Sequence, residues 1–309
     1  MKTLLFFISL ILTACYQEDA SVIPYSINRY PSDSISMEKL DIDSVSSLVV
    51  RDSSFFILDR LRKQVIRTSL SMNPVYRYGA TGRGPSEFSD PFDLSVSDKN
   101  LMVIDFQKRS MMMFDHHLIP SGDISLEYPP FSIMALNDTS VWIGTFDFEF
   151  EDVYVIDLIT KNQSLAGKSR QVDHGMEGIT FHASNQQGTI LRYRQYNHRL
   201  DVFDAEGRQT SFVNPARPER PELDPRSPDA PIFTSKIHHS GFVAGDRACV
   251  LSGDHAPRSQ PMHCFSFDGT WIGNYVLAQD ASMISVYSDS LLYTYSQQTN
   301  HIYVYNLGF

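Results

Sequence analysis

The residues able to do chemistry are scattered along this chain and form no catalytic motif. Its ten histidines include no zinc-type spacing such as His-Glu-x-x-His. No Gly-x-Ser-x-Gly or Cys-x-x-Cys motif is present, and no two carboxylates stand at a spacing that indicates paired acid–base work. A metal site would need ligands from several separate strands, and the candidates near strand starts are Asp93, Glu177 and His239. The alternative is that the histidines lie on the surface and in turns and bind no metal. No cofactor is predicted.

Residues 145–152 alternate aromatic and acidic side chains. Aromatic faces stack on sugar rings, and carboxylates accept hydrogen bonds from hydroxyl groups. Phe146, Phe148 and Glu149 are therefore candidate ligand contacts. The alternative is a long hairpin whose aromatic side chains pack on a neighbouring segment.

Six prolines interrupt residues 214–236, which predicts an extended, polyproline-like connection. Charged residues lie between the prolines, among them Arg217 and Arg220. The segment is either a recognition loop over the mouth of a binding site, which makes these arginines candidate contacts, or a strap along the rim of the fold.

The glycine-rich stretch 79–84 is not a phosphate loop, because no helix follows it to direct its N-terminus at an anion. Pro85 follows instead, and a strand begins after Pro91. Glycines that permit positive φ in a turn explain the stretch. Arg83 and Glu87 are retained as candidate contacts at the mouth of a channel.

The elements that must position these residues are short strands in a repeating unit. Five strands end in an aromatic or aliphatic residue followed by Asp or Asn: Phe114-Asp115, Ile156-Asp157, Phe203-Asp204, Phe267-Asp268 and Tyr305-Asn306. They recur at about 40–50 residues, the period of propeller blades, except where the proline-rich insertion lengthens one interval. We expect the apolar residue to face a neighbouring blade and the Asp or Asn to open a turn by bonding its own backbone. Leu58-Asp59 and Ile104-Asp105 mark the preceding strand in the same way.

The N-terminus reads as a lipoprotein signal. Lys2 precedes an apolar run, Leu4 to Leu12, that is too short to span a bilayer. The run ends in Leu12-Thr13-Ala14-Cys15, which resembles the bacterial lipobox, where cleavage leaves a cysteine that carries a diacylglycerol. The expected organisation is a signal peptide at 1–14, a lipidated tether at 15–34 and one folded domain at 35–309. The acidic residues after Cys15 favour a lipid anchor in the outer membrane, and the cell surface and the periplasmic face both stay open.

The repeat carries a family resemblance. Residues 79–88, then Pro91 and a strand, resemble the inter-blade loop of NHL-type propellers, and Asp105 to Met111 resemble the middle-strand turn of that repeat. With the lipobox, the chain resembles six-bladed β-propeller lipoproteins of the NHL-like/TolB-like group over about Ile35 to Phe309. The resemblance implies an all-β, six-bladed propeller. Members of the group mostly bind ligands, and some are lyases or lactonases with a metal in the channel.

Ring closure follows from the strand count. The last repeat supplies only three strands before the chain ends, whereas a blade needs four. We expect Ile35 to Leu40 to provide the fourth strand, which closes the ring and removes an exposed edge.

Cys249 and Cys264 fall in the two central strands expected for the fifth blade. A symmetric hairpin through residues 253–260 places them directly opposite each other. Opposed residues lie about 4.5–5.5 Å apart at Cα, within reach of a disulfide. Two reduced, buried cysteines are the alternative.

Composition limits the class of function. The chain has 309 residues and a net charge of -10, and an acidic surface argues against nucleic acid as a partner. We expect an envelope propeller that binds a glycan, peptide or protein on one face, which favours binding over catalysis and leaves enzymatic activity open. The alternatives are a metal-dependent lyase or lactonase and a purely structural envelope scaffold.

Overall fold

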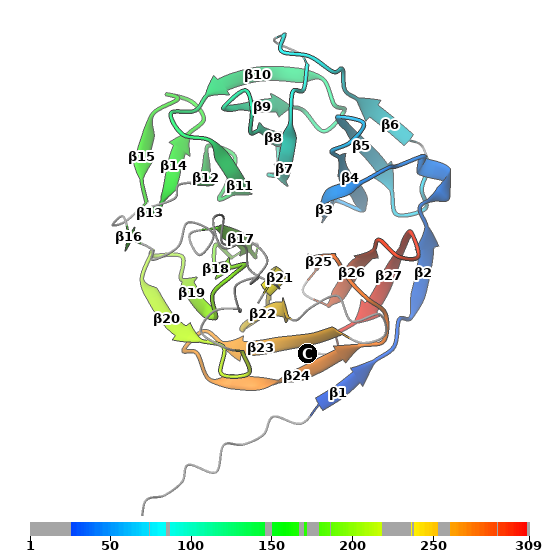
Figure 1. The fold of residues 1–309 in the computed structure, drawn as a ribbon, viewed down its shortest axis with the longest axis vertical. Coiled ribbons are helices and arrows are strands. Elements are labelled where there is room, and N and C mark those ends of the chain that lie inside the picture. The colour runs from blue at the N-terminus through cyan, green and yellow to red at the C-terminus, as the bar shows by residue number, and fades with distance from the viewer. Residues whose placement is uncertain are drawn as a thin grey trace, which may run out of the picture.

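The computed structural model is an all-β ring of six blades, as the sequence predicts (Figure 1). The inner strands of the blades line a central channel. Five blades are built from consecutive antiparallel strands, with the first strand next to the channel and the last on the rim. The sixth takes a strand from the start of the chain. The structure describes residues 26–73, 75–84, 87–145, 150–166, 170–171, 179–185, 187–217, 236, 238–252, 260–288 and 290–307.

The first three blades follow one another along the chain, and in each the strands run in order from the channel outward. Blade one contains β3 (Val45–Arg51), β4 (Ser54–Asp59), β5 (Gln64–Ser69) and β6 (Val75–Tyr78). Blade two contains β7 (Pro91–Val96), β8 (Leu101–Asp105), β9 (Ser110–Phe114) and β10 (Pro120–Ser125). Blade three contains β11 (Pro130–Ala135), β12 (Ser140–Thr145), β14 (Val153–Asp157) and β15 (Gln163–Leu165). A small separate ribbon pairs β13 (Phe150–Glu151) with β16 (Arg170–Gln171).

The other three blades complete the ring. Blade four contains β17 (Thr180–Ser184), β18 (Ile190–Arg194), β19 (Arg199–Phe203) and β20 (Gln209–Val213). Blade five contains β21 (His238–Ala244), β22 (Arg247–Ser252), β23 (Gln260–Ser266) and β24 (Trp271–Leu277). Blade six contains β25 (Met283–Tyr287), β26 (Leu291–Ser296), β27 (His301–Asn306) and, on its outer side, β2 (Asp33–Ser36).

The ring closes through an N-terminal strand, as expected, but the strand has different bounds. β2 pairs antiparallel with β27, and Ile35 lies opposite Ile302. The expected continuation to Leu40 is wrong, because Glu38–Leu40 forms a short 3-10 helix, η1. Met37 and Leu40, three residues apart, are both fully buried in the core between blades six and one. The burial of these two side chains turns the chain inward and ends the strand.

The folded domain also begins earlier than Ile35. β1 (Ser26–Arg29) runs parallel to β24 and makes blade five a five-stranded sheet. The expected tether is therefore corrected over residues 26–34, because the outer edge of blade five offers unpaired backbone groups that a further strand can satisfy. Residues 1–25, including Cys15, lie outside the described residues. Within the described part of the chain, no helix is long and apolar enough to cross a membrane.

The core lies between the blades. Phe114 packs between blades one and two, Ile156 between two and three, and Phe203 between three and four. The strand-end aspartates that follow them accept hydrogen bonds from backbone amides of their own turns, as Asp115 does from Ile119 at 2.9 Å. Asp157, Asp204 and Asp268 do the same. The expected turn-forming role is confirmed for these four aspartates.

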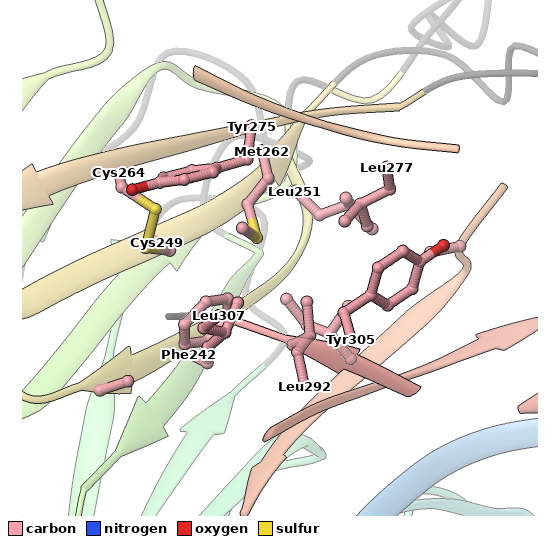
Figure 2. Packing of buried hydrophobic residues seen from close by; sticks show 13 residues of the cluster. Phe242, Cys249, Leu251, Met262, Cys264, Tyr275, Leu277, Leu292, Tyr305 and Leu307 are labelled. Atoms are coloured by element: carbon pink, nitrogen blue, oxygen red, sulfur yellow. A yellow bond between two sulfur atoms is a disulfide. The ribbon is translucent and has the colours of Figure 1, made fainter. Parts of the chain in front are cut away.

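The interface between blades five and six contains the two cysteines (Figure 2). Cys249 lies directly opposite Cys264 in the β22–β23 ladder, the register that the hairpin argument predicts. The structure joins them by a disulfide, with their Cα atoms 4.2 Å apart. Both are fully buried, and Tyr305 of blade six belongs to the same apolar cluster (Figure 2).

Candidate functional site

All six inner strands begin at the same end of the channel. Because each blade is an antiparallel meander, the turn between its second and third strands emerges at this end too. So does the loop that leads to the next blade. We call this end the channel mouth. It opens into a cavity of about 1100 Å³ that residues of all six inner strands line.

A β-bulge recurs near the start of four inner strands. The register against the second strand shifts at Ser46, Phe92, Phe131 and His239, the second residue of each inner strand. A bulge leaves one residue unpaired and redirects its side chain. All four residues line the cavity. The repeat therefore presents an equivalent side chain to the channel mouth from each of these blades.

Aromatic rings form a continuous row across blades two, three and four. The ring of Phe131 lies 4.4 Å from that of Phe92 and 5.6 Å from that of Phe181, between centroids. Phe181 stacks on Tyr193 at 5.8 Å. We call Phe92, Phe131, Phe181 and Tyr193 the aromatic arc. All four line the cavity, so the arc offers ring faces and edges along one side of the mouth.

Arg60 covers the first ring of the arc. Its guanidinium lies 4.4 Å from the centroid of Phe92 and pairs with Asp90 through two hydrogen bonds, of 2.8 and 3.0 Å. Asp90 in turn donates its backbone N–H to Asp105, the strand-end aspartate of β8. The positive charge at this edge of the mouth is thus neutralised inside the protein.

Side chains join the inner strands of neighbouring blades. The Asp93 carboxylate accepts the Ile133 N–H at 3.1 Å, and the Ser95 hydroxyl accepts the Ala135 N–H at 2.8 Å. Ser285 does the same for Val50 at 2.9 Å. Inner strands are sheet edges whose amides have no ladder partner on the channel side. We call these contacts side-chain stitches, and they satisfy edge amides that would otherwise be open.

Among the side-chain stitches named above, the one made by Asp93 involves a titratable carboxyl group. Burial raises its pKa to about 6, although the backbone amides of Ile133 and Leu94 and the Ser47 hydroxyl oppose that shift. A carboxyl group with such a pKa can change its charge near neutral pH.

The side of the mouth formed by blades four and five is polar. Gln195 follows Arg194, whose buried guanidinium pairs with Asp201 at 2.8 Å, and the two backbone hydrogen bonds of Gln195 go to Ile179 and His238. The Gln195 residue is only 7% exposed. Lys236 and Gln195 both line the cavity.

Two buried histidines lie beneath the start of the proline-rich segment. The Asn214 amide donates to Nδ1 of His263 at 2.8 Å and to Nε2 of His238 at 3.3 Å. His238 in turn donates from Nδ1 to the Arg194 carbonyl at 2.9 Å. Burial lowers the pKa of His238 to about 3 and that of His263 to about 4. Both rings must therefore be neutral to accept from one amide.

The two metal candidates that the structure describes are not brought together. Asp93 and His239 both line the channel, but they belong to blades two and five, which lie on opposite sides of the ring (Figure 1). No group of three His, Cys, Asp or Glu side chains among the described residues could hold a metal ion. Glu177 lies outside the described residues.

Three of the candidate ligand contacts, Arg83, Glu87 and Arg217, lie in the described part of the chain. The Glu87 carboxylate accepts the Gly84 N–H at 2.7 Å within its own loop. Arg83 is exposed, and neither residue lines the cavity. Arg217 is half-buried beside the histidine pair, and its carbonyl lies 3.4 Å from His198 Nδ1. The remaining candidates lie outside the described residues: Phe146, Phe148, Glu149 and Arg220.

Sequence reasoning missed the aromatic arc. The available signal was a repeated pair at the strand starts, an aromatic residue followed by a polar one, in Phe92-Asp93, Phe131-Ser132 and Phe181-His182. The aromatic residue of each pair lines the cavity at the mouth. The polar residue contacts the next blade: Asp93 accepts the Ile133 N–H, and the Ser132 hydroxyl lies 3.2 Å from Nδ1 of His182.

Comparison with known proteins supports the architecture. No family model and no curated protein sequence matches the chain. A member of the duf4221 family from Bacteroides vulgatus has the same fold, with a TM-score of 0.57 and 10% identity over 86% of this chain and 92% of that one. A putative exported protein from Bacteroides fragilis gives a TM-score of 0.56 and 11% identity, over 87% and 88% of the two chains. Virginiamycin B lyase from Staphylococcus aureus gives a TM-score of 0.56 and 9% identity, over 90% of this chain and 88% of that one. At these identities the likeness shows the fold alone.

Proposed function

We propose that this protein is a lipid-anchored propeller of the cell envelope that binds a ligand at the channel mouth. The observation that carries the proposal is the convergence of bulged residues and the aromatic arc on one cavity of about 1100 Å³. A concave site that combines aromatic side chains with polar groups able to fix orientation is the usual form of a ligand site. The ligand is a glycan, a peptide or a segment of a protein partner.

The proposed address is the outer membrane, with the lipid on Cys15. The lipobox-like sequence before that residue supports it, and so does the fold shared with a putative exported protein. The N-terminal strand β1 lies on the outer rim of blade five (Figure 1). An anchor upstream of Ser26 would therefore hold the propeller by its rim and leave the channel mouth open.

A binding screen tests the proposal. Purified protein is screened against glycan and peptide arrays, and Phe131→Ala should abolish capture of any ligand found, because it removes the centre of the aromatic arc. Tyr128→Ala is the matched control, since Tyr128 is 41% exposed and does not line the cavity. Ligands that bind wild type and Phe131→Ala equally would exclude the channel mouth as the site. A purely structural scaffold would capture none.

A metal-dependent lyase or lactonase is the second candidate. The raised pKa of Asp93 favours it, since a carboxyl group that titrates near neutral pH can exchange protons with a substrate. The screen is therefore repeated with and without a chelator, and every captured ligand is analysed by mass spectrometry for bond cleavage. Cleavage that the chelator stops would replace the binding proposal with this one.

A further inference from the structure

The chemistry of the channel mouth narrows the class of ligand, an inference that rests on the proposed function. Lys236 places a positive charge at the cavity. It has no hydrogen bond or ion pair with any described residue, and burial alone lowers the pKa of its ammonium group. Arg60, by contrast, is paired with Asp90. An anionic group placed near Lys236 would offset the cost of holding that charge in a half-buried position.

Gln195 offers a second contact. The Gln195 residue is 7% exposed and lines the cavity, and its side-chain amide carries both a donor and an acceptor. A ligand group that can both donate and accept a hydrogen bond matches this amide. A hydroxyl group supplies both.

The aromatic arc supplies the third contact. Its rings span three neighbouring blades, so the arc extends further than a single ring of a ligand. Serine side chains of blades one, five and six line the rest of the mouth, at Ser46, Ser240 and Ser282. A fatty acid would need an apolar tunnel, whereas this lining suits a ligand rich in hydroxyl groups.

A peptide fits less well. Peptides often bind by adding a strand to an exposed sheet edge, where backbone amides supply the affinity. In this propeller the side-chain stitches already occupy edge amides of β3, β11 and β25, at Val50, Ile133, Ala135 and Ile284. Recognition must therefore come from side chains, which favours a ligand made of rings.

We propose that the channel mouth binds an acidic oligosaccharide. Its sugar rings lie against the aromatic arc, a carboxylate contacts the Lys236 ammonium, and ring hydroxyls bond the Gln195 amide. The cavity of about 1100 Å³ exceeds the range of sites for single small molecules, so several sugar units fit.

The test uses full-length protein in detergent and three acidic tetrasaccharides: tetragalacturonate, tetramannuronate and a hyaluronan tetrasaccharide. Each is compared by calorimetry with its carboxyl-reduced form, which keeps the rings and replaces the charge by a hydroxymethyl group. We expect at least one acidic sugar to bind at least tenfold more tightly than its reduced form. Lys236→Met should remove that preference, whereas Lys236→Arg should keep it. Gln195→Leu should weaken both forms.

Lys99→Met is the matched control, since the Lys99 side chain is 77% exposed in a turn at the other end of the channel. Equal affinity for the acidic and reduced sugars, no effect of Lys236→Met, or no binding of any of the six sugars would overturn the inference. The proposed function would survive those results if a peptide or neutral glycan bound in a Phe131-dependent way. The proposed function would fail separately if Phe131→Ala did not change the binding of any ligand.

Discussion

The carboxylate of Asp93 in blade two accepts a hydrogen bond from the backbone N–H of Ile133 in blade three, at 3.1 Å. The contact satisfies an edge amide of one inner strand with a side chain of the next. It also joins two blades that otherwise meet mainly through apolar packing. The same residue borders the channel, so one carboxyl group contributes both to the stability of the ring and to the charge of the site.

The first prediction concerns the pH dependence of this stitch. The pKa of Asp93 in the folded protein, about 6, lies above its ordinary value. The folded state therefore binds the proton more tightly, and the free energy of unfolding falls as pH rises from about 4 to 6. Because Asp93→Asn cannot titrate, the wild type should lose about 2 kcal/mol relative to this variant between pH 4 and 7. This free-energy difference is smaller than the full pKa shift of Asp93 would give, because its carboxyl group borders the channel.

Urea unfolding of both proteins at pH 4 and pH 7 measures the difference. Asp98→Asn is the control, because the Asp98 side chain is 75% exposed. A constant gap between wild type and Asp93→Asn at the two pH values would show that Asp93 titrates normally.

The second prediction concerns the buried histidine pair, whose pH dependence has the opposite sign. The pKa values of His238 and His263, about 3 and 4, lie below the ordinary value for histidine. The unfolded state therefore binds more protons below about pH 6.5, and the free energy of unfolding falls as pH falls from 7 to 5. Each histidine should contribute about 2 kcal/mol to this loss by pH 5.

His263→Phe removes one of the two groups and keeps an aromatic ring beside Trp271, 5.9 Å from the present ring. The variant should therefore lose less free energy of unfolding between pH 7 and 5, by about half of the loss that the two histidines cause together. His301→Phe, which changes a histidine at the start of β27 in blade six, serves as the control. An unchanged loss in His263→Phe would mean that the imidazole is not held neutral.

Sequence patterns predicted the blades better than the site. Phe114-Asp115 and its repeats are local signals, since each aspartate bonds its own turn, and so their period reports the blade count. The bulge at Phe92 has no local signal, because it exists only relative to the register of β8. β1 was missed for a similar reason: Ser26–Arg29 has no apolar alternation, and only the open edge of β24 makes it a strand. Gln195 resembles an ordinary turn residue in the sequence, and only the assembled ring places it at the cavity wall.

The third prediction separates the two N-terminal strands. A chain that starts after Arg29 lacks only β1, which lies on the outside of blade five and leaves the ring closed. A chain that starts after Leu40 also lacks β2, Met37 and Leu40, so β27 becomes an open edge and the core between blades six and one loses two buried side chains. We expect the first to unfold cooperatively and the second to aggregate or unfold without a sharp transition. Equal melting curves for the two truncations in scanning calorimetry would refute closure by β2.

The fourth prediction concerns the anchor. If Cys15 carries a lipid, Cys15→Ala should move the protein from the membrane pellet to the soluble fraction in a Gram-negative host. Cys249→Ala, which alters a cysteine buried in blade five, should leave the protein in the pellet. Metabolic labelling with a fatty-acid analogue gives an independent reading, and label on the Cys15→Ala protein would contradict the assignment.

The last prediction concerns the bond between Cys249 and Cys264. The two residues close a short hairpin loop, with a sequence separation of 15, and loops of this length give about 3 kcal/mol in the chain-entropy account of disulfides. Replacing both by alanine should therefore lower the free energy of unfolding by about 2–3 kcal/mol, while the lining of the channel stays the same because neither residue belongs to it. Reduced wild-type protein is the comparison and should resemble the double variant. The bond itself is checked by alkylating exported protein without reductant, and the recovery of two alkylated thiols would show that the pair is reduced in its own compartment.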